Sequence, residues 1–425
     1  MTAPSRSLAT SGAALLALIG LSACGATTSS TTGGAAGCSG SVSVATDLPT
    51  GGSDASDGVP TQNGAQLAVE QAKAKNLLGG CTINYIPKND SSVALGKHDP
   101  NVGAANMTEL AGNQAVLGVV GPFNSNVGQN QERIANTADL TMISPTNTNP
   151  GLTIVGSNPD IDTASLRPTG KITYFRVCTT DIGQGRGLAQ AATTRLNVKK
   201  AFVIDDQETY GKGLADQFVK YFAQAGGTVA DRASEPGNTR DFREVLSKAQ
   251  REGVDLIFFG GTSSNGGGIV RNQMVSILPA AKYLGGDGIV DGEFVTEAGP
   301  AGEGAFGTIA APDPTKLPSA EQFVRDYRAR FNAAPGAYSA NAYDAMNILL
   351  AAIKKAIDDN GGKLPGDPKA FREAVRSNVA ATSYDGAIGH TSFDQNGDTS
   401  NVLLTLEKVA GGKWIFDETI RVGAS

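Results

Sequence analysis

The chain has 425 residues, of which 40% are hydrophobic and only 6% aromatic, and its formal net charge is −6. This length suffices for a large core and for two or more domains. The charge is mildly negative and the sequence contains no basic run, which argues against nucleic acid and anionic membrane surfaces as partners.

The N-terminal residues 1–23 predict an export signal. An apolar run at 13–21 is too short to span a bilayer as a mature helix, and it ends in Leu-Ser-Ala-Cys at 21–24. This ending resembles a bacterial lipoprotein signal and predicts lipid attachment at Cys24, which would anchor an extracytoplasmic protein to the cell membrane of a bacterium. The alternative is an ordinary secretory signal with a cysteine there by chance. Residues 24–37 are nearly all Gly, Ser, Thr and Ala and predict a flexible tether.

Three further cysteines, Cys38, Cys81 and Cys178, would lie in an oxidising compartment. Cys38 and Cys81 each come just before a predicted strand. If these strands are parallel neighbours, both cysteines lie at the same end, within reach of a disulfide. We predict a Cys38–Cys81 disulfide and a free, buried Cys178.

Beyond the tether, short β-rich runs alternate with amphipathic helical stretches. In a first block we expect strands at 42–46, 83–86, 116–120 and 142–144, and helices at 63–76, 103–111 and 127–138. In a second block we expect strands at 201–204, 228–230, 254–259 and 283–284, and helices at 185–195, 213–225, 242–251 and 269–277. Repeated units of this kind predict an α/β fold with parallel sheets covered by helices on both faces.

The end of the chain departs from this alternation. Two long helices are expected at 319–332 and 337–358, and a strand pair at 402–408 and 413–417. These C-terminal elements must therefore dock on one or both blocks.

The residues that follow the predicted strands are the candidate ligand contacts, because ligands of open parallel sheets bind beyond the carboxyl ends of the strands. These stretches are 47–49 (DLP), 121–126 (GPFNSN), 145–148 (PTNT), 205–211 (DDQETYG), 260–264 (GGTSS) and 285–288 (GGDG). Glycine, hydroxyl, amide and a few acidic side chains suit hydrogen bonding to a small polar ligand.

Ten segments, in order along nearly the whole mature chain, resemble the type I periplasmic binding proteins. The similarity is to the leucine/isoleucine/valine-binding branch, which serves ABC importers. The segments are NGAQLAVEQAK (63–73), GVVGPFNSN (118–126), ISPTNTNPGLT (143–153), YFRVCTTD (174–181), YGKGLADQF (210–218), DFREVLSKAQ (241–250), VDLIFFGG (254–261), YLGGDGI (283–289), AYDAMNILLAAI (342–353) and GHTSFDQNGD (389–398).

The resemblance implies two doubly wound parallel-sheet lobes joined by three crossovers, which close on a ligand like a hinge. It places 38–178 plus 313–401 in lobe 1, and 179–312 plus 402–425 in lobe 2.

The resemblance also implies a ligand site. Ser125 and Thr148 match first-lobe residues that hold the ligand carboxylate, and Thr146 matches a position whose backbone carbonyl accepts from the ligand ammonium. Asp287 matches the second-lobe acid that pairs with that ammonium. The two second-lobe positions that contact ligand on closure are Tyr210 and Thr262.

Most of these residues also have an ordinary structural interpretation. Ser125 could be a helix N-cap, a position that is also an anion site. Thr146 and Thr148 could be turn residues between prolines. Asp287 could be a turn acid between glycines, and Tyr210 a packing residue.

The sequence departs from the family where a ligand side chain would lie. The first loop offers Asp54 and Asp57 where some leucine binders place an aromatic wall. Asn124 and Asn126 are polar where apolar or small residues are common, and 154–170 is longer than the usual link. The head-group contacts therefore match better than the side-chain pocket.

Nothing in the sequence indicates an enzyme, a cofactor or a metal. His98 and His390 are far apart, and no H-E-x-x-H or G-x-S-x-G motif occurs. The glycine-rich stretch 260–268 lacks the G-K-[ST] of a phosphate loop. The sequence DQNGD at 394–398 lacks the spaced glutamate of a calcium loop and is interpreted as a hairpin turn.

The favoured function is a lipid-anchored, monomeric solute receptor that delivers an amino acid, branched-chain or related, to an ABC permease. A sensory protein that reports to a membrane kinase or receptor would use the same fold. A small amide or urea-like solute is the alternative ligand.

Overall fold

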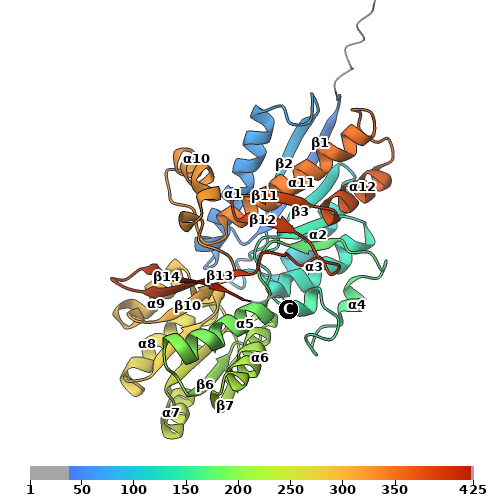
Figure 1. Cartoon of the computed structure of the whole chain (residues 1–425). Helices are drawn as coiled ribbons and strands as arrows, with labels where there is room; N and C mark the ends of the chain where they lie inside the picture. Colours follow the sequence, from blue (N-terminus) through green and yellow to red (C-terminus); the bar gives the residue numbers. More distant parts are fainter. Residues whose placement is uncertain (1–37, 423–425) are drawn as a thin grey trace, which may run out of the picture. The chain divides into compact units, whose positions relative to one another are not determined.

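The computed structural model describes residues 38–422. The signal, Cys24 and the tether predicted for residues 1–37 lie outside the described residues. Two sheets, each covered by helices, account for most of the fold (Figure 1). Within 38–422, no helix is long and apolar enough to cross a bilayer.

The first sheet has five parallel strands in the order β2-β1-β3-β4-β5. The strands are β1 (Ser41–Leu48), β2 (Thr82–Asn89), β3 (Val116–Val120), β4 (Thr141–Ser144) and β5 (Tyr174–Arg176). The helices around it are α1 (Ala55–Ala74), α2 (Pro100–Gly112), α3 (Ser125–Thr137), α4 (Thr163–Leu166), α10 (Glu321–Phe331), α11 (Ser339–Asp359) and α12 (Pro368–Ala380).

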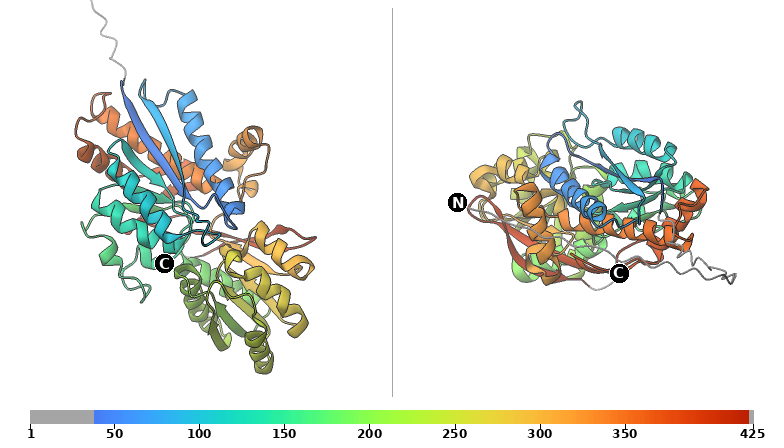
Figure 2. Two further views of the ribbon diagram at one scale, coloured as in Figure 1. Left: turned by 180° about the vertical axis from the view of Figure 1, so that it is seen from behind. Right: turned by 90° about the horizontal axis from the view of Figure 1, so that it is seen from above.

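Alternate residues of the first sheet enter two separate cores. Val44 packs with the core formed by α1, α10, α11 and α12, whereas its neighbour Ala45 packs with α2, α3 and α4. Helices α1 and α11 lie side by side although they are far apart in the sequence (Figures 1 and 2). Burial on both faces explains why these strands are almost continuously apolar.

The second sheet has seven strands in the order β14-β13-β10-β9-β8-β6-β7. They are β6 (Lys200–Asp205), β7 (Thr228–Ser234), β8 (Leu256–Gly260), β9 (Lys282–Gly285), β10 (Phe306–Ile309), β13 (Leu403–Val409) and β14 (Trp414–Arg421). Its helices are α5 (Asp181–Gln190), α6 (Thr209–Gln224), α7 (Arg243–Glu252), α8 (Gly267–Ile277) and α9 (Gly292–Ala298). Strands β6 to β10 are parallel, and β13 and β14 continue the sheet in antiparallel orientation.

The chain passes between the two sheets three times, after β5, after β10 and before β13. Helices α10 to α12 return to the first sheet, with the hairpin β11 (Ser383–Gly386) and β12 (Gly389–Ser392) beside them. We call the elements around the first sheet the first lobe and those around the second sheet the second lobe. The exact boundaries given above stay a prediction.

The sequence placed one helix start wrongly and missed several short elements. Helix α1 begins at Ala55 rather than at 63. Pro60 lies inside the helix, where it removes one i→i−4 hydrogen bond, and the packing of α1 against α11 outweighs this loss. Asp57 is therefore in the first turn of a helix and not in a loop. Strands β5 and β10 were not predicted, since three or four residues are too few to show a period.

The predicted disulfide is present in the first lobe. Strands β1 and β2 are parallel neighbours with Ser41 opposite Thr82, and Cys38 and Cys81 precede them at the same end. Their Cα atoms are 5.0 Å apart and their sulfurs are bonded. Cys178 is a free, buried thiol.

Candidate ligand site between the two lobes

The predicted site residues meet around one small cavity, although they come from five segments of the chain. Its volume is about 30 Å³, and Phe123, Asn124 and Gly288 complete its lining. The predicted residues in the lining are Ser125, Thr146, Thr148, Tyr210, Thr262 and Asp287. The residues follow strands of both sheets, as expected for a ligand site of parallel α/β lobes.

The first-lobe wall combines a helix start with a loop hydroxyl. Ser125 is the first residue of α3, and Asn124 occupies the N-cap position that the sequence suggested for Ser125. The buried Thr148 Oγ1 makes no hydrogen bond of standard geometry with the residues that the structure describes, and it lies beside the carboxyl of Asp181, whose pKa it lowers. A helix N-terminus and a hydroxyl together form a setting that favours an anion.

Local hydrogen bonds hold the loop that carries Thr148. Ser144 Oγ donates to the carbonyl of Pro122 (2.8 Å) and accepts from the N–H of Asn147 (2.8 Å). The Thr146 hydroxyl donates to the Phe123 carbonyl at 2.7 Å. The side chain of Thr146 therefore fixes the loop, which is consistent with a ligand role for its backbone only.

The buried Arg176 also holds this loop in place. The guanidinium of Arg176 donates to the carbonyls of Asn147 (2.8 Å) and Asn149 (3.0 Å), and its Nε lies 2.7 Å from Asp398 Oδ1. Asp398 belongs to the DQNGD sequence, where Asp394 Oδ1 accepts from the Asp398 N–H at 2.9 Å. This sequence thus forms a turn that supplies the counter-ion of Arg176.

The second-lobe wall is centred on Asp287. Its carboxylate accepts hydrogen bonds from Gln184 Nε2 (2.8 Å), Tyr210 Oη (2.7 Å) and Tyr338 Oη (2.6 Å). Burial raises the pKa of Asp287, and these three donors act in the opposite direction. Burial also raises the pKa of both tyrosines well above the ordinary value, so that their hydroxyls stay protonated donors.

Thr262 is the remaining second-lobe member of the lining. Its hydroxyl lies 2.9 Å from Ser264 Oγ, and its N–H donates to Asp206 Oδ2 at 3.3 Å. Because the buried Asp206 accepts this hydrogen bond from the Thr262 N–H, it fixes the loop that follows β8.

Sequence reasoning missed three residues of this site. Tyr338 and Gln184 donate hydrogen bonds to Asp287. The third residue is the buried Asp181, whose pKa is raised well above its ordinary value, first by burial and then by the nearby Asp287. The only sequence signal was the proximity of each residue to a family-like segment. The contacts themselves join positions 51 to 103 residues from Asp287.

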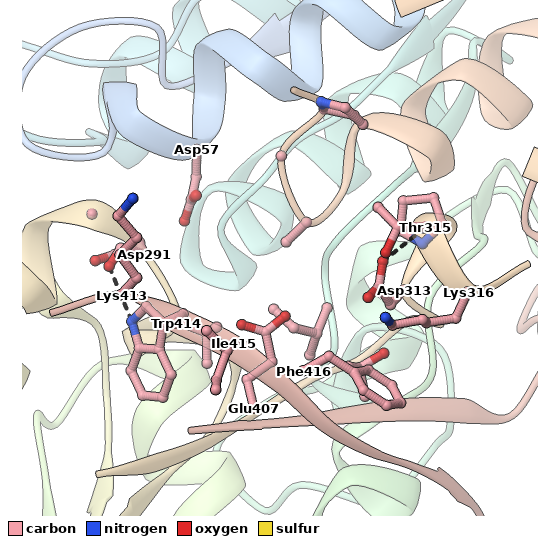
Figure 3. A pocket seen from close by; sticks show the side chains of 18 of the residues that line it. Asp57, Asp291, Asp313, Thr315, Lys316, Glu407, Lys413, Trp414, Ile415 and Phe416 are labelled. Atoms are coloured by element: carbon pink, nitrogen blue, oxygen red, sulfur yellow. Dashed lines mark hydrogen bonds between the residues drawn. The ribbon is translucent and has the colours of Figure 1, made fainter. Parts of the chain in front are cut away.

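A larger cavity of about 650 Å³ is lined by Val290 and Asp291, which follow Gly288 of the small cavity closely in the chain. Asp57 points into it from the start of α1, and Asp291 and Trp414 line it from the second lobe (Figure 3). Burial and the nearby Asp291 raise the pKa of Asp57 well above its ordinary value. Burial raises the pKa of Asp291 to about 6. Of the two acidic residues in place of an aromatic wall, Asp57 therefore faces this second space, whereas Asp54 pairs with His98.

Comparison with known proteins identifies the relatives of the chain. The Leu/Ile/Val-binding protein homolog 1 of Brucella suis is 29% identical over 379 residues, covering 88% of this chain and 93% of that protein. The Leu/Ile/Val-binding protein BraC3 of Rhizobium johnstonii is 28% identical over 379 residues, covering 89% and 94%.

Solved structures agree with these relatives. The leucine binding protein LivK of Thermotoga maritima superimposes with a TM-score of 0.75 at 26% identity, covering 89% of this chain and 99% of that chain. A solute binding protein of an ABC transporter from R. palustris, in complex with benzoate, has a TM-score of 0.72 at 20% identity, covering 91% and 98%.

Residues 41–412 match the family model described as periplasmic binding protein. The match spans almost all of the described chain and includes the first sheet, every strand of the second sheet except β14, and the cavity between them. The chain therefore belongs to the periplasmic binding protein family, whose members are solute-binding proteins of ABC transporters and not enzymes.

Proposed function

We propose that the protein binds an amino acid, branched-chain or related, between its two lobes and delivers it to an ABC permease while Cys24 anchors it by a lipid. The observation that carries this proposal is the composition of the small cavity. Hydroxyl groups and a helix N-terminus line one wall, and a carboxylate lines the opposite wall. These are complementary to the two charged ends of an amino-acid head group.

The ligand carboxylate would lie against the first lobe. The Ser125 hydroxyl, the first N–H groups of α3 and the Thr148 hydroxyl would supply donors there. Charge-assisted hydrogen bonds of this kind are each worth about 1.5–3 kcal/mol.

The ligand ammonium would lie against Asp287. A carboxylate has about four acceptor positions, and three neutral donors occupy Asp287 already. One position thus remains for the ammonium, and the backbone carbonyl of Thr146 is the partner proposed on the other side.

Ligand binding would be coupled to hinge closure. The cavity volume of about 30 Å³ is close to the share of one water molecule in the liquid and is too small for an amino acid. The walls must therefore separate to admit the ligand, and they lie further apart around a bound amino acid than in this arrangement. A ligand that contacts both walls then favours the closed arrangement by the contacts it gains there.

Similar proteins support an amino acid. The relatives above are Leu/Ile/Val-binding proteins, and a LivJ of Streptococcus pneumoniae, 24% identical with a TM-score of 0.74, is in complex with isoleucine. An aromatic carboxylate is a second candidate, because Asp287 is already satisfied by neutral donors and would tolerate a ligand without an ammonium. The R. palustris protein in complex with benzoate shows such a ligand in this fold.

A thermal-shift screen tests the ligand class. The panel holds branched-chain amino acids, lysine and arginine because of Asp57 and Asp291, benzoate, and small amides with urea. We expect an amino acid to raise the unfolding temperature, and Asp287→Ala to abolish that shift. Stabilisation by benzoate or an amide alone, with no response to any amino acid, would contradict the proposal.

Two further measurements test transport and anchoring. Uptake of the labelled ligand that is lost when the gene is deleted distinguishes delivery to a permease from sensing. The intact mass of the membrane-extracted protein shows a lipid on Cys24, and Cys24→Ser should release the protein from the membrane.

A further inference from the structure

Beside the ligand cavity, a second group of contacts joins the lobes without lining that cavity. Glu208 of the second lobe directly precedes α6. Its carboxylate accepts from three first-lobe donors: Lys97 Nζ at 2.6 Å, Asn126 Nδ2 at 2.9 Å and His98 Nε2 at 3.2 Å. One side chain of the second lobe is thus held by three of the first.

The first-lobe half of these contacts is fixed by Asp54. Its carboxylate accepts from the backbone N–H of His98 (3.0 Å) and lies 2.5 Å from His98 Nδ1. The imidazole, only 1% exposed, therefore has a carboxylate on each side. Burial alone would lower its pKa, but Asp54 and then Glu208 raise the pKa of His98 to about 10, so the ring is a cation.

The second-lobe half is fixed by Asp206. Its carboxylate accepts from the N–H of Glu208 (3.0 Å) and from Asn265 Nδ2 (2.7 Å), and Asn265 Oδ1 is a further acceptor for Lys97 Nζ. The same carboxylate accepts from the N–H of the cavity-lining Thr262. The position of Glu208 and the wall of the ligand cavity thus depend on one buried group.

Among Lys97, His98, Asp54 and Glu208, the charges balance only when the lobes meet, while burial raises the pKa of the neighbouring Asp206 to about 7. Lys97 and His98 carry two positive charges, and Asp54 supplies one negative charge from the same lobe. Glu208 brings the second negative charge from the other lobe. The side chain of Lys97 is 14% exposed and that of Glu208 25%, so solvent screens this pair less than an exposed surface pair.

We propose that Glu208 is the second-lobe anchor of a latch that holds the lobes closed independently of the ligand. The inference rests on the proposed function in one respect, that closure traps the bound molecule. Because the latch residues do not line the cavity, they add the same closed-state stabilisation for every ligand. Glu208 thus sets how long a ligand is held and leaves the order of ligand preference unchanged.

The same helix offers a matched control. Lys212 of α6 pairs with Asp160 of the first lobe at 2.5 Å, but the two side chains are 39% and 57% exposed. An exposed pair of this kind contributes little. Asp160→Asn therefore removes an ion pair between the lobes without touching the latch.

The test measures closure and release separately in the full chain. Small-angle X-ray scattering without any added amino acid should show a larger radius of gyration for Glu208→Gln than for the wild type, with Asp160→Asn unchanged. Stopped-flow release of leucine, isoleucine and valine should be faster in Glu208→Gln by a common factor, roughly tenfold. Lys97→Met should also make release faster. In the double variant, release should be accelerated by less than the product of the two single factors, because both variants break the same contact.

The outcomes separate the latch from the proposed function. If the variant opens but none of the three amino acids binds the wild type, the latch stands and the proposed ligand class is wrong. Identical scattering and release rates in Glu208→Gln and wild type would overturn the latch. A change confined to one amino acid would also overturn it, because it would place Glu208 in contact with the ligand side chain.

Discussion

The two walls of the ligand cavity are built in different ways. On the first lobe, Ser125 and Thr148 stand on segments that local hydrogen bonds fix, such as those of Ser144. On the second lobe, one carboxylate, Asp287, is held by side chains from distant positions, among them Tyr338. The hydrogen bonds of the first wall join positions 3 to 29 residues apart, with Asp398 as a more distant counter-ion of Arg176. A wall assembled from distant segments depends on how those segments meet.

The largest expected effect is on the stability of the first lobe, which carries the first wall. Replacing both Cys38 and Cys81 by serine removes a disulfide that closes a separation of 43 residues. The free energy of unfolding of the first lobe should fall by about 2–4 kcal/mol, because the unfolded chain gains freedom. Differential scanning calorimetry should then show the first lobe melting before the second.

Cys178→Ala is the control for this prediction, since it removes a thiol but no crosslink. A single unchanged transition in the double serine variant would mean that the disulfide does not limit the stability of the first lobe.

The assembled wall is tested by Asp287→Asn. This variant removes the charge and keeps a side chain that can bond to Tyr210 and Tyr338. The affinity for an amino acid should fall by about 1.5–3 kcal/mol, or roughly 10- to 150-fold, while the unfolding temperature changes little. Titration calorimetry measures the affinity.

Asp291→Asn is the matched control, because Asp291 follows closely in the chain but lines the larger cavity. An equal loss of affinity in both variants would show that the charge of the region matters and not the contact of Asp287.

The first-lobe wall is tested by two valine substitutions. Thr148→Val removes a hydroxyl that lines the cavity beside the carboxyl of Asp181, and it should lower the affinity by about 0.5–1.5 kcal/mol with a smaller effect on stability. Thr146→Val removes a hydroxyl that donates to the Phe123 carbonyl and should mainly lower stability. Calorimetric titration and thermal unfolding of both variants separate the effects; the reverse pattern would exchange the roles of the two threonines.

The smallest expected effect is the dependence of ligand affinity on pH, which appears only below neutral pH. Burial raises the pKa of Asp287 above its ordinary 3.8, and only the ionised form attracts an ammonium. Affinity should therefore be full at neutral pH and fall as the pH is lowered through the raised pKa, at a higher pH than an exposed aspartate would require. Titrations from pH 7 to pH 4 check this, and a similar slope in Asp287→Asn would assign the dependence to another group.

Sequence patterns predicted the fold well where elements are long and periodic. Strand β3 was placed at its observed bounds, and the C-terminal strand pair was placed within a few residues. Short elements escaped, as did the start of α1, where Pro60 lies inside the helix and tertiary packing sustains it. Local propensity is outweighed when a helix buries a long face.

The candidate site was predictable on the wall whose contacts are local. The loop 145–148 follows a strand at a sheet edge, and Ser125 begins a helix, so their positions follow from the chain itself. Tyr338 and His98 could not be assigned. One bonds to Asp287 and the other to Glu208, and only the folded chain brings these pairs together.

The only tryptophan of the chain offers a direct optical view of the two walls. Trp414 lines the larger cavity opposite Asp57 of the first lobe, and its indole Nε1 donates to the carbonyl of Asp291 at 3.1 Å (Figure 3). Separation of the lobes exposes this indole to water and should move its emission to longer wavelength. The fluorescence of the unlabelled protein thus reports in real time on the motion that brings the two walls together.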